Sequence, residues 1–162
     1  MSYSWCYKIF IPMHQHNVKQ EAKLLSAFNR LRSAYNLSFT YQEIFYNTII
    51  GLDILRRKVL IVEACNPRYD FRVIDLDKVS ACCLKKIYSA VSSGYFEKNI
   101  ARERLDGIVL QFDFKSDSPP VIVAFLPKTM NSSFNMAEVL YKGRQWEMLI
   151  SKMISFPEQK IA

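Results

Sequence analysis

The chain has 162 residues, which fits one domain of ordinary size, and half of them are hydrophobic, so a packed core is expected. With 4 Gly, 6 Pro and 14% aromatic residues, the composition excludes collagen-like, low-complexity and disordered chains. The net charge of +7 favours anionic partners such as nucleic acid, acidic proteins or a membrane surface, although a basic excess also serves solubility alone.

Residues 1–16 are interpreted as a lead-in segment. The alternation of Trp5, Tyr7 and Ile9 with their neighbours permits a short strand, which Pro12 would end. The segment lacks the charged start, apolar core and cleavage site of a signal peptide. No stretch approaches the roughly 18 uninterrupted apolar residues of a membrane span, so we expect a cytoplasmic protein.

A single α+β domain is predicted over residues 17–156, with a short tail at 157–162. Its first helix begins at Asn17, because Asn17 and Gln20 fit a capping box, and it is expected to end at Asn36. Apolar residues at helical spacing give this helix a stripe that faces the core. The stripe consists of Leu24, Leu25, Phe28, Leu31 and Tyr35.

The middle of the chain predicts about six strands joined by short turns, and therefore an antiparallel sheet. Before them, Thr40–Glu43 fits a second capping box that would open one helical turn. Residues 97–105 fit either a short helix or an ordered loop. The strands are expected at 46–52, 59–62, 71–76, 80–88, 107–115 and 121–126. The last of them is apolar on both faces, which favours a central position in the sheet.

A final amphipathic helix is predicted from a cap at Asn135 to about Ser155, before Pro157. Its apolar stripe is expected to pack on a strand face, although a helix carrying Trp and Met could instead form a groove for a partner. The stripe consists of Val139, Trp146, Leu149, Ile150 and Met153, and the strand face of Leu110, Phe112 and Phe114. The expected architecture is a barrel-like sheet with a helix at each end of the chain.

Motifs for cofactor chemistry are missing from the sequence. There is no nucleophile elbow, and the four glycines are too scattered to form a phosphate-binding loop. His14 and His16 alone are too few for a zinc site, so we expect neither a metal nor a cofactor. The cysteines, Cys6, Cys65, Cys82 and Cys83, show no C-x-x-C spacing and are expected to be reduced.

Two groups of charged residues remain as candidates. Asp75 and Asp77 could act as a carboxylate pair, but Asp also favours turns because its side chain binds nearby backbone N–H groups, and we predict a turn. Arg56, Arg57 and Lys58 lie between two predicted strands, where their side chains would project together into solvent. Such a cluster is a candidate anion-binding site, and the alternative is a turn charged only for solubility.

The chain resembles the pleckstrin-homology-like barrel domains of bacterial proteins. The features that carry the resemblance are Gly51–Asp53, Ile74–Leu76 and the final helix with Trp146, and it spans residues 44–155. In such domains that bind phosphorylated lipid heads, basic residues of the first strand–strand turn commonly hold the ligand. The resemblance therefore implies this role for the turn at 56–58.

These observations together predict a non-enzymatic binding or scaffold domain that contacts an anionic ligand or a protein partner. The alternative is a small enzyme whose site would need a deep pocket with convergent Asp, Cys or His groups. A nucleic-acid partner is disfavoured, because a stacking platform needs exposed aromatic residues, and those of this chain fall mostly on predicted core faces.

Overall fold

The structure is a computed structural model that describes residues 3–65, 67–91, 102–126 and 136–156. Its helices and strands are α1 (Tyr3–Ala34), β1 (Tyr41–Phe45), β2 (Thr48–Asp53), β3 (Lys58–Cys65), β4 (Arg68–Asp75), the 3-10 helix η1 (Leu76–Lys78), β5 (Val79–Val91), β6 (Arg102–Phe114), β7 (Val121–Leu126) and α2 (Met136–Ser155). The predicted α+β class is confirmed. The chain forms two compact units, Met1–Val73 and Ile74–Ala162, and the predicted single domain stays a prediction.

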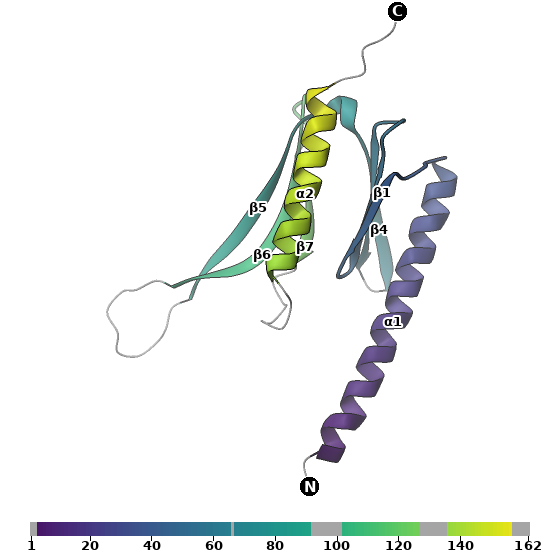
Figure 1. The fold of residues 1–162 in the computed structure, drawn as a ribbon, viewed down its shortest axis with the longest axis vertical. Coiled ribbons are helices and arrows are strands. Elements are labelled where there is room, and N and C mark those ends of the chain that lie inside the picture. Colours follow the sequence, from purple (N-terminus) through teal and green to yellow (C-terminus); the bar gives the residue numbers. More distant parts are fainter. Residues whose placement is uncertain (1–2, 66, 92–101, 127–135, 157–162) are drawn as a thin grey trace, which may run out of the picture. The chain divides into compact units, whose positions relative to one another are not determined.

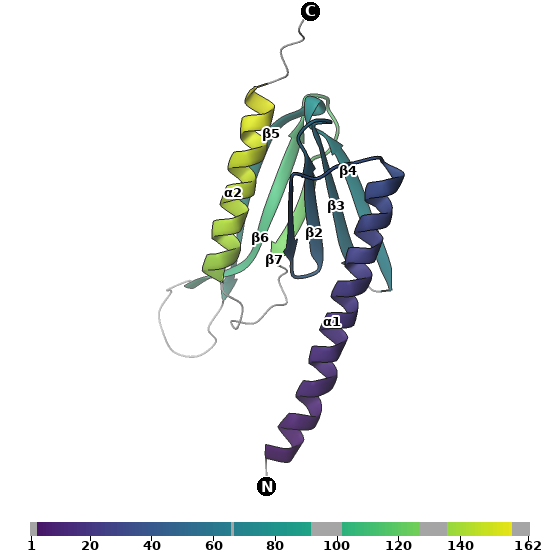
Figure 2. The same ribbon diagram turned by 45° about the vertical axis from the view of Figure 1, so that its right-hand side comes forward.

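The strands form two antiparallel sheets, one in the order β1-β2-β3-β4 and one in the order β5-β6-β7 (Figures 1 and 2). The prediction of one barrel-like sheet of about six strands is wrong, since the described residues contain seven strands and no closed barrel. Turn signals along a sequence mark where strands end, but they do not say whether consecutive strands pair. Here β4 and β5 are separated by η1 and belong to different sheets.

In the first unit, α1 lies on β2 and β3, and its N-terminal half runs past the end of the sheet (Figures 1 and 2). The helix begins at Tyr3, so the predicted strand within residues 1–16 and the predicted helix start at Asn17 are both wrong. A short apolar run fits a helix as well as a strand. The fixed φ angle of Pro12 is also compatible with a helix, although its ring removes one hydrogen bond.

The predicted end of this helix is confirmed. Asn36 adopts the left-handed conformation with a φ angle of 52°, which Asn tolerates better than most residues. Its N–H donates to Ser33 O at 3.1 Å, and the N–H of Leu37 donates to Arg32 O at 2.9 Å. This pair of bonds is a Schellman motif, which satisfies the last carbonyl groups of α1 and turns the chain toward β1.

The core of the first unit lies between α1 and the sheet. It contains Leu24, Ala27, Phe28, Leu37, Ile49, Leu60 and Val62. Of the predicted stripe, Leu24 and Phe28 are buried, but Leu25 and Tyr35 are exposed. Leu25 follows Leu24 by about 100° around the helix axis, which carries it off the sheet-facing side.

Gly51 makes room for two aromatic rings in this core. Phe28 and Phe39 stack with their centroids 4.9 Å apart, and a Cβ atom on Gly51 would lie 2.7 Å from Phe28 Cζ. We predict that Gly51→Ala lowers the free energy of unfolding by about 1–3 kcal/mol, because the rings must move apart. Chemical denaturation measures this change, with Ser116→Ala on an exposed turn as the control. Equal midpoints for Gly51→Ala and the parent chain would contradict it.

The predicted helical turn at Thr40–Glu43 is wrong, because residues 41–45 form β1. A capping signal needs helical spacing of apolar residues after it, and here Phe45 and Tyr46 lead into a tight hairpin instead. The two strands predicted on either side of the basic turn are confirmed as β2 and β3. They pair antiparallel, with Asp53 opposite Lys58 at the closed end.

The second unit contains the β5-β6-β7 sheet, in which β6 is central. β7 therefore lies at an edge of the sheet, and Ile122 on it is 52% exposed. The prediction of a central strand at 121–126 is wrong, because Val and Ile favour edge strands as well as central ones. The predicted alternation along β6 is confirmed in part: Ile108, Leu110 and Phe112 are fully buried, but Val109 on the other face is buried too and Phe114 is only partly buried. Residues 102–105 belong to β6, and the rest of the ambiguous stretch lies outside the described residues, as do Asn135 and Pro157.

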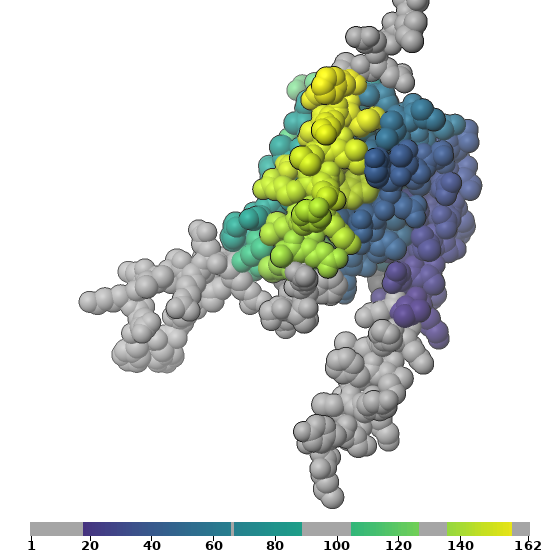
Figure 3. All heavy atoms as spheres, in the orientation of Figure 1, coloured from purple at the N-terminus to yellow at the C-terminus, as the bar shows by residue number. Residues whose placement is uncertain are grey.

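Helix α2 lies along β5 and runs antiparallel to it, with one side open to solvent (Figures 1 and 3). Gly143 allows close approach, because a Cβ atom there would lie 2.9 Å from Leu84 Cδ1. Glu147 Oε1 accepts the Leu84 N–H at 2.8 Å, and Ser151 Oγ donates to Cys82 O at 3.4 Å. Because β5 pairs with β6 on its other side, these bonds satisfy backbone groups at the sheet edge.

Three of the five residues in the predicted stripe of α2 are buried, and the other two, Leu149 and Met153, are partly buried. Val139, Trp146 and Ile150 are at most 8% exposed, so the core interpretation of Trp146 is confirmed, whereas Met148 is 59% exposed. α2 also contacts β6 and β7. The specific packing of its stripe on Leu110, Phe112 and Phe114 stays a prediction.

We predict that Trp146→Ala lowers the free energy of unfolding by about 3–5 kcal/mol, because it removes a large buried side chain and leaves a cavity. Guanidinium denaturation measures this loss. Met148→Ala, two residues along the same helix but exposed, should change stability by no more than about 0.5 kcal/mol. Similar midpoints for the two variants would mean that Trp146 is not part of the core.

Candidate binding surfaces

The basic residues lie on the turn that joins β2 to β3, at residues 54–57, with Lys58 opening β3. The Arg57 N–H donates to Ile54 O at 3.3 Å, which closes the turn. Arg57 has a φ angle of 54°, in the left-handed region that commonly ends a short hairpin loop. The predicted position between two antiparallel strands is confirmed.

Asp53, at the end of β2, holds this turn in shape through hydrogen bonds to its carboxylate. Its side chain is fully buried and accepts three hydrogen bonds, from Ser38 N at 2.8 Å, Arg56 N at 2.9 Å and the Arg56 guanidinium at 3.4 Å. Burial alone would raise the pKa of Asp53. The hydrogen bonds and the Arg56 charge outweigh burial, so the pKa lies below its ordinary value of 3.8.

The three cationic side chains are not equally accessible. The Arg56 side chain is 41% exposed, Lys58 is half-buried, and Arg57 as a residue is only 6% exposed. The expectation that all three project together into solvent is therefore wrong for Arg57. Leu55, at the tip of the same turn, is 79% exposed.

The position of this turn along the sheet also differs from the expected one. Because β1 precedes β2, the first hairpin turn is at Tyr46 and Asn47, and the basic residues occupy the second. The pattern of basic residues in the first turn, which the resemblance implied, does not apply to 56–58. Only the charges of the turn itself favour an anionic ligand there.

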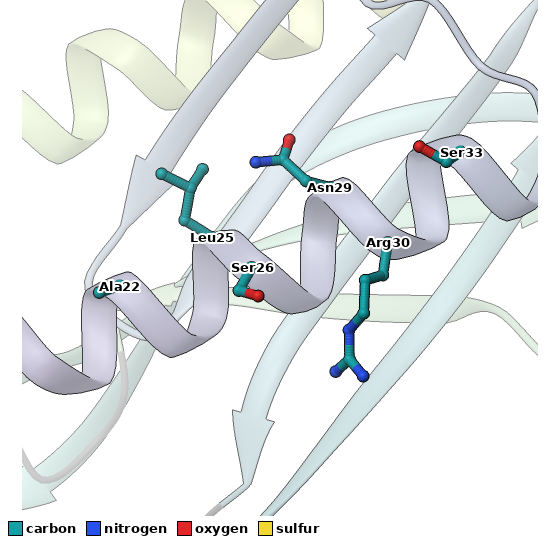
Figure 4. A pocket seen from close by; sticks show the side chains of 6 residues that line it. All are labelled: Ala22, Leu25, Ser26, Asn29, Arg30 and Ser33. Carbon is teal, nitrogen blue, oxygen red and sulfur yellow. The ribbon is translucent and has the colours of Figure 1, made fainter.

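A second surface lies on α1, on the face turned away from β2 and β3. A shallow, open hollow is lined there by Ala22, Leu25, Ser26, Asn29, Arg30 and Ser33. Figure 4 looks onto this face, with strands behind the helix. In this view Leu25 and Asn29 point to one side of the helix axis and Arg30 points to the other. The sequence analysis assigned Leu25 to the core-facing stripe and did not consider this face, although Ala22, Leu25 and Asn29 are spaced as a second row on the helix.

The predicted turn at Asp75 is confirmed. Asp75 Oδ1 accepts the Asp77 N–H at 3.0 Å and caps η1, so this carboxylate serves the backbone. Among the described residues, no group of three or more His, Cys, Asp or Glu could hold a metal ion. His14 and His16 lie in α1, but their side chains are outside the described part.

The described cysteines, Cys65, Cys82 and Cys83, are free thiols. Burial, together with the nearby Cys83, raises the pKa of Cys82 far above its ordinary value, and burial and Asp70 raise that of Cys65. A thiol with a raised pKa is a poor nucleophile at neutral pH. Within the described residues, no helix is long and apolar enough to cross a membrane.

Comparisons with protein-family models, curated proteins and solved structures found no match for this chain.

We predict that Asp53→Asn lowers the free energy of unfolding at pH 7 by about 1–3 kcal/mol, because hydrogen bonds to a buried charge are lost. A carboxylate with a lowered pKa stabilises the fold fully above its unfolded-state pKa, and this contribution is lost as the pH falls through the folded-state pKa. The gap between Asp53→Asn and the parent chain should therefore narrow below about pH 4.

Guanidinium denaturation at pH 7 and pH 3 measures this gap. Asp117→Asn, on an exposed turn, provides the control, and its stability should follow that of the parent chain at both values. A gap of the same size at pH 3 as at pH 7 would show that the Asp53 charge does not stabilise the turn.

Proposed function

We propose that the chain is a non-enzymatic binding domain, pleckstrin-homology-like in character, that holds an anionic ligand at the turn between β2 and β3. The observation that carries this proposal is the distribution of charge. Residues 1–73 contain ten Lys and Arg against five Asp and Glu, a net charge of +5, whereas residues 74–162 contain twelve against ten, a net charge of +2. Most of the positive field therefore belongs to the unit that carries the turn.

The geometry of the turn supports binding by Arg56. Arg56 donates two hydrogen bonds to Asp53, one from its backbone N–H and one from its guanidinium group, while its side chain stays 41% exposed. An Arg positioned in this way loses little conformational entropy when a phosphate or carboxylate binds the remaining N–H groups. Lys58, half-buried at the start of β3, adds a second positive charge near the same turn.

The free thiols Cys65, Cys82 and Cys83 are compatible with a reducing compartment such as the cytoplasm, which forms part of the proposal. There the ligand would be a phosphorylated small molecule or a phosphorylated lipid head. These share one chemistry, a compact anion with several oxygen acceptors, which Arg recognises through paired hydrogen bonds.

We predict that Arg56→Ser with Lys58→Ser weakens binding to vesicles of phosphatidylcholine that contain a phosphorylated inositol lipid. Each cation near an anionic surface contributes about 1 kcal/mol, so removing both should weaken binding about thirtyfold. Co-sedimentation measures the affinity, and binding should fall as salt is raised.

The matched control is Lys86→Ser with Lys152→Ser, which removes the same charge from exposed positions of the second unit and should leave binding close to that of the parent chain. Competition by a soluble inositol phosphate separates recognition of the head group from attraction to the surface. Equal losses in the two double variants would leave only a general effect of net charge and would refute a site at this turn.

A further inference from the structure

The outer face of α1, opposite Leu24, Ala27 and Phe28, carries a shallow hollow between charged residues. A helix that lies on a sheet normally presents charged residues to solvent, and Lys19, Glu21, Lys23 and Arg32 do so here. The hollow itself is lined by Arg30 and by small or uncharged residues. These residues are Ala22, Leu25, Ser26, Asn29 and Ser33 (Figure 4).

The spacing along this face is that of a contact between two helices. Val18, Ala22, Leu25 and Asn29 follow one another by four, three and four residues, which matches the a/d spacing of a heptad seam over about one and a half heptads. Val18 is 56% exposed and Leu25 is 37% exposed, so both apolar side chains are available to a partner. Small residues beside them, such as Ser26, allow a second helix to approach closely.

The charged residues beside the seam determine which kind of partner helix it can bind. Lys19, Lys23 and Arg30 are exposed along one flank of the seam, and Lys19 and Arg30 are about 16 Å apart along the helix axis. On the other flank lie Glu21, which is exposed, and Arg32, which is engaged with Leu37 O and with the Phe39 ring. The open flank is therefore a row of positive charges, which complements acidic side chains one or two turns apart on a facing helix.

A second copy of this chain, packed antiparallel, is a poorer occupant. In an antiparallel pair of identical helices the same flanks meet, so that Lys19, Lys23 and Arg30 of both copies would face one another. Like charges at these positions repel, and partner choice in paired helices depends on such flanking charges.

We propose that the outer face of α1 docks an acidic amphipathic helix of a partner protein. The Val18–Asn29 seam supplies the close contact, and the row of Lys19, Lys23 and Arg30 supplies the charge selection. This surface is separate from the turn between β2 and β3, so the inference goes beyond the proposed function and does not rest on it.

Two synthetic helical peptides test the inference on the full chain. Both carry Leu and Ala at the seam positions; one has Glu on its flanks and the other has Lys. Fluorescence anisotropy should show binding of the Glu peptide and little binding of the Lys peptide. Lys19→Glu with Lys23→Glu should weaken the Glu peptide by at least about tenfold and improve the Lys peptide, because the charge selection is reversed.

Two control variants define the surface. Lys86→Glu with Lys152→Glu makes the same change in net charge on the second unit and should leave peptide binding unchanged. Ser26→Trp places a bulky side chain in the seam and should abolish peptide binding while leaving the thermal unfolding midpoint and vesicle binding through the turn as they were.

Three results would overturn the inference: no binding of the Glu peptide, equal binding of the two peptides, or equal effects of the two double variants. A concentration-dependent dimer that Ser26→Trp dissolves would also overturn it, because the face would then serve self-association. None of these results bears on the vesicle assay, so the proposed function is judged separately.

Discussion

The first unit depends on one buried carboxylate. Asp53 joins two segments that are distant in sequence, because it accepts the backbone N–H of Ser38, which follows α1, and of Arg56, in the turn after β2. A charge without water around it is costly unless it is paired and hydrogen-bonded, so the three bonds to Asp53 stabilise this arrangement of the chain. The exposed position of Arg56 follows from the same bonds, and the candidate anion site is therefore built on a structural group.

The orientation of α1 has a similar local cause. The stack of Phe28 on Phe39 sits where Gly51 leaves space on β2, and this fixes the rotation of the helix about its axis. Because Leu24, Ala27 and Phe28 together face the sheet, the helical repeat of 3.6 residues places Asn29 near the opposite side and Leu25 at the border between the two faces. The surface available to a partner is thus decided by the packing of the core.

Much of the fold could be predicted from patterns within short stretches of sequence. The hairpin of β2 and β3, the stop at Asn36, the turn at Asp75 and the burial of Trp146 each depend on local chemistry that neighbouring residues reveal. Other features depend on tertiary packing, which the spacing of residues along the sequence does not encode. These are the division of the strands into two sheets, the edge position of β7 and the burial of Arg57. The start of α1 was missed because an apolar run such as 5–11 has no unique period. For the binding surfaces, the sequence predicted the position of the basic turn but neither the unequal exposure of its cations nor the second row on α1.

The hydrogen bonds between α2 and β5 join a helix to a strand, two elements that differ in their rise per residue. Four residues of a helix advance about 6.0 Å and two residues of a strand about 6.6 Å, so Glu147 and Ser151 can meet Leu84 and Cys82 together. Inserting or deleting one residue between Glu147 and Ser151 would rotate one of them by about 100° and break the match. During evolution this stretch of α2 should accept exchanges at its exposed positions, such as Met148, but not a change in length.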